Sequence, residues 1–129
     1  MKCVRVGSPD RFDELVKKAL SGSDAVFVLF FGREDPGTNL SWCSDCVVAD
    51  PKVRRAIGAV DGSVLLEVPV DRKSDIGSPS NVYRTRKDTK VERVPTLLRW
   101  TPSGPSDTRL VEDECTEALI KEYVVKTSP

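Results

Sequence analysis

The sequence contains no histidine, and only 6% of its 129 residues are aromatic. Without histidine, Ser-His-Asp and Cys-His catalysis, zinc binding through imidazole and imidazole general-base chemistry are all excluded. No charge of one sign is in excess either, since 20 Lys and Arg residues balance 20 Asp and Glu residues. A neutral chain has no overall field that attracts nucleic acid or anionic lipid, so we expect neither as a partner.

Long apolar runs are absent as well. The longest, 25–31, has seven residues, too few to span a membrane, and 1–7 lacks the apolar core of a secretory signal. We therefore expect a cytoplasmic protein, in which cysteines stay reduced. The length and the 39% hydrophobic content predict a single domain over 1–129. No apolar stripe is left unassigned, so we expect a monomer.

Apolar periodicity predicts an alternation of strands and helices. Ser8 is a candidate helix N-cap, and Pro51 is expected to kink or divide the second helix. Strands that alternate with helices and end in a hairpin predict an α/β fold, with a mixed sheet and helices on both faces. The expected strands are 4–6, 25–31, 63–70, 95–100 and 108–111, and the expected helices are 9–22, 43–60 and the segment after 112, with a weak helical signal at 81–86.

Two cysteines, Cys43 and Cys46, are separated by Ser44 and Asp45 and follow the apolar strand and a polar loop. At a helix start, free backbone N–H groups and the helix dipole stabilise a thiolate at Cys43. Cys43 is therefore the predicted nucleophile, and Cys46 the resolving thiol that attacks the mixed disulfide formed on Cys43. The spacing also fits half of a zinc site or two inert core thiols. The other two cysteines form no second pair of this spacing, so we expect no metal.

Several segments together resemble the thioredoxin fold, and within it the branch of thioredoxin-related proteins called thioredoxin domain-containing protein 17. That branch carries Ser-Trp-Cys-Pro-Asp-Cys, which 41–46 matches except at Ser44. The resemblance spans nearly the whole chain and is carried by 32–40, 41–46, Pro51, 94–98 and 110–115.

The resemblance implies a thioredoxin fold and a cytosolic disulfide reductase that binds no cofactor of its own. Electrons would come from NADPH through thioredoxin reductase, and the substrates would be small disulfides such as cystine, nitrosothiols or selected protein disulfides. It also implies a cis-proline at Pro95, facing the cysteines. Val94, Pro95 and Thr96 would pair with an extended substrate by strand addition, and Trp42 would shield the Cys43 thiol and contact substrates.

Two departures from the thioredoxin pattern bear on the chemistry. Ser44 stands where the family branch has proline, so this chain has an additional backbone N–H in the first helical turn, and that N–H can bond the Cys43 thiolate. The strand 25–31 contains no acid, so proton transfer to and from Cys46 needs another group. Asp45 is the nearest carboxylate in the sequence. It either takes part in that transfer or tunes charge and specificity from the surface, and its negative charge opposes thiolate formation.

Two further functions fit the same motif. One is a redox-dependent binding module with little turnover, which contacts its partner through the loop 32–40 and the basic segment 83–90. The other is a disulfide-forming oxidase or isomerase, which the lack of a visible secretion signal disfavours. The loop 32–40 either restricts bulky protein substrates or is a neutral insertion. The basic segment, with Arg93, is either a solvated face or a docking patch for an acidic partner.

Overall fold

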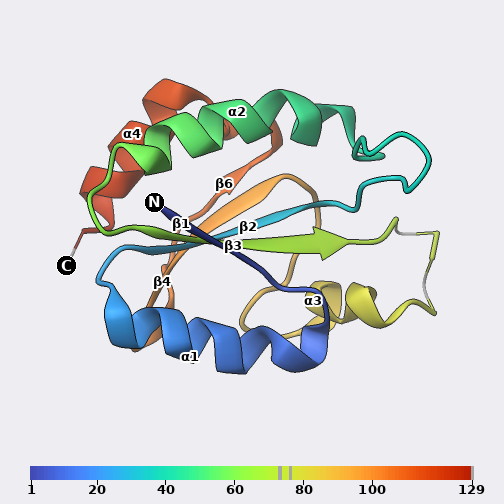
Figure 1. Cartoon of the computed structure of the whole chain (residues 1–129), viewed down its shortest axis with the longest axis horizontal. Helices are drawn as coiled ribbons and strands as arrows, with labels where there is room; N and C mark the ends of the chain where they lie inside the picture. The colour runs from blue at the N-terminus through green and yellow to red at the C-terminus, as the bar shows by residue number, and fades with distance from the viewer. Residues whose placement is uncertain (73, 76, 129) are drawn as a thin grey trace.

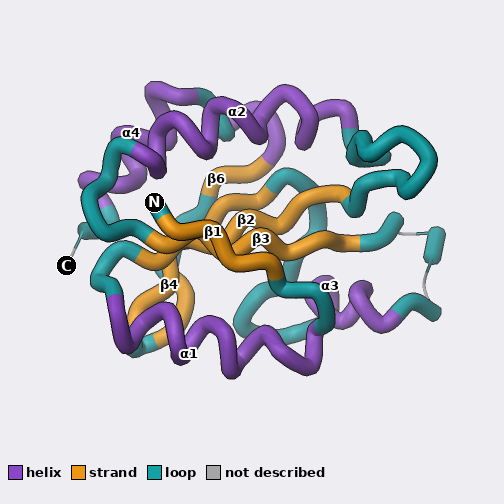
Figure 2. Tube along the Cα trace, viewed as in Figure 1, coloured by secondary structure: helices purple, strands orange, loops and turns teal. Residues whose placement is uncertain are grey.

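The structure is a computed structural model that describes residues 1–72, 74–75 and 77–128. A six-stranded mixed sheet forms its centre and helices cover both faces, which confirms the predicted α/β fold (Figures 1 and 2). The strands are β1 (Lys2–Arg5), β2 (Val26–Gly32), β3 (Val64–Val70), β4 (Thr96–Thr101), β5 (Gly104–Pro105) and β6 (Leu110–Val111). The helices are α1 (Phe12–Gly22), α2 (Ser44–Gly58), α3 (Val82–Thr85) and α4 (Glu117–Lys126), with short 3-10 turns at Pro9–Arg11, Pro79–Asn81 and Glu112–Glu114.

The order of the strands places one end of the sheet under the cysteine motif. β1, β3 and β2 are parallel neighbours in that order, β4 is antiparallel to β2, and β5 and β6 both pair with β4. Gly32 at the end of β2 lies opposite Val70 at the end of β3, and Phe30 lies opposite Thr96 at the start of β4. Cys43 follows β2, so the motif meets the end of β3 and the start of β4.

The central strand β2 supplies both layers of the core. Val26, Val28 and Phe30 face α1 and α3, whereas Phe27 and Leu29 face α2 and α4. All five are at most 2% exposed, as expected for a continuous apolar run in a strand that is covered on both faces. Figure 1 shows α1 and α3 on one side of the sheet and α2 and α4 on the other.

Local differences from the predicted elements have packing causes. β1 ends at Arg5 rather than continuing to Val6, but the Val6 amide still donates to the Glu67 carbonyl at 2.9 Å, so the strand pairing extends past the formal end. Pro51 does not divide α2, which is one helix from Ser44 to Gly58. The helix has buried residues before and after the proline, and this tertiary packing offsets the lost backbone hydrogen bond.

A helix that crosses a lipid bilayer needs about 20 mostly apolar residues. Among the helices of the described residues, none combines the length and the apolar character needed to cross a bilayer.

Candidate active site

Cys43 occupies the N-cap position of α2. Its backbone is extended (φ −101°, ψ 109°), and its Sγ accepts a hydrogen bond from the Cys46 backbone N–H at 3.2 Å. The sulfur therefore takes the place of the oxygen that usually caps a helix, at the positive end of the helix dipole. A thiolate at this position is stabilised by both interactions, which fits the nucleophile role predicted for Cys43.

Cys46 lies one turn further along α2, in a different environment. Its side chain is 4% exposed, and its Sγ accepts from the Gly32 backbone N–H at 3.4 Å. Burial raises the pKa of the Cys46 thiol well above its ordinary value, and the neighbouring Cys43 thiol adds to the rise. Cys46 is therefore held as a neutral thiol, which fits a group that acts second. Both cysteines are free thiols in the structure.

The segment from Val94 to Thr96 lies directly against the nucleophile. The Cys43 Sγ donates to the Val94 carbonyl at 3.5 Å, and the Val94–Pro95 peptide bond is cis, as the resemblance implied. The Pro95 carbonyl accepts from the Glu112 N–H at 2.8 Å, and the buried Thr96 hydroxyl donates to the Arg93 carbonyl at 2.6 Å. These bonds fix the segment next to Cys43, and its role in substrate binding stays a prediction.

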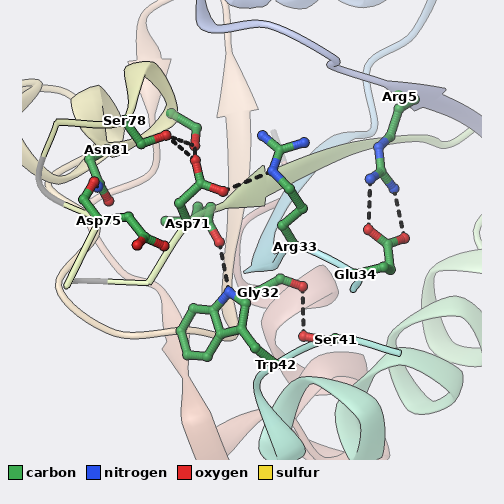
Figure 3. Close-up of polar contacts among 12 residues, drawn as sticks. Arg5, Gly32, Arg33, Glu34, Ser41, Trp42, Asp71, Asp75, Ser78 and Asn81 are labelled. Atoms are coloured by element: carbon green, nitrogen blue, oxygen red, sulfur yellow. Dashed lines mark hydrogen bonds and ion pairs between the residues drawn. The ribbon is translucent and has the colours of Figure 1, made fainter. Parts of the chain in front are cut away.

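Trp42 is half-buried beside Cys43, and its indole nitrogen forms a hydrogen bond (Figure 3). The indole Nε1 donates to the Val70 carbonyl at 3.1 Å, and the Arg72 guanidinium lies 5.9 Å from the ring centroid. Ser44 and Asp45 project from the first turn of α2 as exposed residues. The shielding role of Trp42 and the proton-transfer role of Asp45 both stay predictions.

A cavity of about 230 Å³ reaches Cys46 from the side of the loop 33–41. Asp50, one turn after Cys46 on α2, lines the same cavity, and its carboxylate accepts from Arg54 Nε at 2.9 Å. Sequence reasoning overlooked Asp50, although its spacing of four residues from Cys46 puts both on one face of the helix. Cys46 and the Asp50 carboxylate therefore line one cavity.

Gly32 was also overlooked, and it permits the closest packing in the site. A Cβ at this position would lie 2.8 Å from Ser41 Oγ, 2.8 Å from Trp42 Cε2 and 2.9 Å from Cys43 Cβ. Its carbonyl accepts from the Ser41 hydroxyl at 2.6 Å, and its N–H donates to Cys46 Sγ. The lack of a side chain at Gly32 thus allows the loop to fold back onto the end of β2.

A carboxylate near Trp42 links the end of β3 to Arg33 and to two serine hydroxyls before α3 (Figure 3). Asp71 accepts from Arg33 Nε at 2.9 Å and from the hydroxyls of Ser78 and Ser80. Burial by itself would raise the pKa of Asp71, but these hydrogen bonds outweigh it and hold the pKa below its ordinary value. Asp71 therefore ties the end of β3 to the loop after β2, which also carries the motif.

This network predicts a pH-dependent stability. A carboxyl whose pKa is lower in the folded state stabilises the protein above its unfolded pKa, and this contribution is lost as the pH falls through the folded value. Asp71→Asn should lower the free energy of unfolding at neutral pH by about 1–2 kcal/mol and make its fall below about pH 4 less steep. Urea denaturation across pH 3–7 measures both effects, with the exposed Asp61→Asn as control. Parallel curves for Asp71→Asn and the unchanged protein would contradict this assignment.

The remaining cysteines lie apart from the motif. Cys115 is 3% exposed, and burial raises its pKa to about 12, so it is an inert core thiol. Cys3 is exposed on β1 and accepts from Arg54 at 3.5 Å. Among the described residues, no three His, Cys, Asp or Glu side chains are grouped so that they could hold a metal ion.

A thiol pair at the start of a helix, behind a buried central strand and against a cis-proline, defines a thioredoxin-fold thiol–disulfide protein. Solved structures agree on the fold. Oxidised thioredoxin O2 from Arabidopsis thaliana superposes with a TM-score of 0.68 over 99% of this chain and 96% of that one, at 19% identity. Reduced thioredoxin pre-protein from Schistosoma mansoni superposes with a TM-score of 0.67 over 98% of each chain, at 13% identity.

The sequence matches place the chain more narrowly. Residues 6–126 match the family model for the thioredoxin domain of thioredoxin domain-containing protein 17-like proteins, and the chain belongs to that family. Human thioredoxin domain-containing protein 17 is 39% identical over 101 residues, which cover 77% of this chain and 76% of that protein. Thioredoxin-like protein Clot of Arabidopsis thaliana is 33% identical over 88 residues, 67% of this chain and 66% of that protein. The family supports a thiol redox role.

One set of matches is to longer proteins. Acireductone dioxygenase of Leishmania infantum is 38% identical over 85 residues, which cover 61% of this chain. The chain spans only 25% of the length of that relative, so the match assigns no activity to the chain.

Proposed function

We propose that the protein is a disulfide reductase that acts on small or selected disulfides through Cys43 and Cys46. The observation that carries this proposal is the contrast between the two sulfurs. Cys43 Sγ caps the N-terminus of α2 and accepts from a backbone amide there, with the residue 8% exposed, whereas Cys46 lies deeper, is 4% exposed and has a pKa that burial raises. The Cys43 sulfur is thus placed to attack the substrate first, and the Cys46 sulfur is placed to act second.

The reaction has two exchange steps. The Cys43 thiolate attacks one sulfur of the substrate disulfide, which forms a mixed disulfide and releases the first substrate thiolate. Cys46 then loses its proton and attacks Cys43 Sγ, which releases the second substrate thiolate and leaves a Cys43–Cys46 disulfide. The two released thiolates take up protons. We propose that Asp50 receives the Cys46 proton through the cavity that both residues line.

The oxidised protein must regain two electrons before the next cycle. We propose that thioredoxin reductase supplies them from NADPH, that the protein holds no cofactor, and that it works as a monomer in the cytoplasm. The exposed Ser44 and Asp45 lie between the two buried cysteines, and they support contact with such a partner at this surface.

The loop 33–41 supports a narrow choice of substrate. Glu34 bridges to Ser41 across the loop, and Arg5 on β1 holds the Glu34 carboxylate by two hydrogen bonds of 2.7 and 3.1 Å. A loop fastened in this way forms a fixed wall beside the motif, with Leu40 58% exposed on it. Such a wall favours small disulfides over bulky proteins.

The test is NADPH consumption with thioredoxin reductase and this protein, with cystine or insulin as the acceptor. We expect turnover with cystine, much less with insulin, and none with cystine when Cys43→Ser replaces the unchanged protein. Equal turnover with both acceptors would contradict the narrow specificity. No turnover with either, while Cys43 still reacts with an alkylating reagent, would contradict the reductase and favour a redox-dependent binding module.

A further inference from the structure

A second cavity, of about 440 Å³, adjoins the segment that carries Pro95. Thr96 lines it, and Arg93, also in the lining, precedes the residue whose carbonyl accepts from Cys43 Sγ. Under the proposed function, the cavity therefore adjoins the segment that would pair with a substrate. Its lining residues are Lys90, Glu92, Arg93, Thr96, Arg109 and Val111.

Positive charge dominates this lining. Lys90, Arg93 and Arg109 contribute three cations and Glu92 one anion. Arg93 is paired with Glu112 at 3.3 Å, but neither Lys90 nor Arg109 forms an ion pair with any of the residues that the structure describes. Two cationic groups therefore face the cavity without a carboxylate of their own, and a carboxylate from outside would find both available.

Hydrogen bonds hold the Arg109 guanidinium and the backbone of Lys90. Arg109 Nη1 donates to the Thr89 carbonyl at 2.7 Å, and the buried Thr89 hydroxyl donates to the Tyr83 carbonyl at 2.7 Å. Lys90 has a left-handed backbone (φ 41°), unfavourable for a lysine, and its N–H donates to the Arg86 carbonyl at 2.8 Å. Strain of this kind persists only where the surrounding bonds impose it, so the loop fixes the backbone of Lys90, from which the exposed side chain extends.

From these observations we infer an anion subsite that binds an acidic side chain next to the cysteine of a peptide disulfide. This inference rests on the proposed function and names its substrate class. A peptide in strand pairing beside Val94 would pass Arg93, and each extended residue advances about 3.3 Å. A carboxylate one to three residues from the substrate cysteine would then reach Lys90 and Arg109. Of the basic segment 83–90, it is the last residue, Lys90, that would bind the substrate carboxylate.

The test follows the first exchange step alone. Cys46→Ser protein is mixed with capped peptide disulfides whose cysteine is flanked by two Glu, two Gln or two Lys residues. Mass spectrometry measures the rate at which the mixed disulfide forms at Cys43. Each peptide is compared between protein variants, so that its own intrinsic reactivity cancels. The variants add Lys90→Gln alone or Lys90→Gln with Arg109→Gln, and the control adds Lys17→Gln with Lys18→Gln, an equal charge change outside the cavity.

We expect the double cavity variant to capture the Glu peptide about fivefold more slowly and the Gln peptide within about twofold of the unchanged rate. Lys90→Gln alone should show part of the effect, which raised salt should weaken. Equal slowing of the Glu and Gln peptides, or equal effects of the cavity and control pairs, would overturn the subsite. In either of these outcomes, capture of the Gln peptide would still show that the exchange step at Cys43 works. Capture of no peptide would overturn the proposed function and the subsite together.

Discussion

Cys43→Ser is expected to lower the rate of disulfide reduction by roughly 1,000-fold or more. Cys46→Ser protein should still attack a substrate disulfide once and then stop. The difference follows from the geometry. Cys43 Sγ is bonded to a helix N-terminal amide, and without it the motif has no sulfur at the N-terminus of α2. The buried Cys46 thiol has a raised pKa and cannot take over. In Cys46→Ser, the mixed disulfide on Cys43 should persist because nothing displaces it.

Turnover of cystine and mass spectrometry of the quenched protein measure these two outcomes. Cys115→Ser serves as the matched control, because it removes a buried cysteine that lies outside the motif. This variant should keep the unchanged turnover. Persistent turnover in Cys43→Ser, or a stable adduct on Cys46 rather than Cys43, would reverse the assigned roles.

Gly32→Ala should destabilise the protein by about 1–3 kcal/mol and also impair the site. The added Cβ would meet Ser41 Oγ, Trp42 Cε2 and Cys43 Cβ, all closer than 3.0 Å. Because three consecutive residues of the motif segment are contacted, they must all move to make room. The Gly32 N–H to Cys46 Sγ bond would then be disturbed as well. Denaturant unfolding and the alkylation rate of Cys43 measure the two effects.

Gly58→Ala is the matched control for this substitution. Gly58 is the last residue of α2, and a Cβ there would have no neighbour within 4 Å. Alanine in a helix restricts the unfolded chain, so we expect a gain of about 0.4–1 kcal/mol and unchanged thiol reactivity. If Gly32→Ala and Gly58→Ala had the same effect, close packing at Gly32 would not be what holds the motif.

Much of the fold was predictable, because it depends on local patterns. The apolar run 25–31 predicted β2, since a strand covered on both faces needs no polar alternation. Ser8 was correctly predicted as an N-cap, and its Oγ accepts from the Asp10 N–H, although a 3-10 turn precedes α1. The helix start at the cysteine motif was also predicted, to within one residue, from the loop and the apolar positions after it.

Residues whose roles depend on distant partners were not predictable. Gly32 is important only because the loop 33–41 folds back onto it, and the one local signal was a glycine at the end of an apolar run. Asp71 gains its role from Arg33, 38 residues away. Arg99 is 3% exposed in β4 because it donates to the carbonyls of Asp24 and Val124, 75 and 25 residues away. No residue spacing in the sequence indicates such contacts.

The central claim is that Cys43 and Cys46 together carry two electrons to a disulfide. The most direct measurement mixes the reduced protein with cystine, quenches it by alkylation and maps all four cysteines by mass spectrometry. We predict a Cys43–Cys46 disulfide, formed in proportion to the cysteine released, with Cys115 and Cys3 still alkylatable after unfolding. Recovery of Cys43 and Cys46 as alkylated thiols, with oxidation at Cys3 instead, would contradict the account.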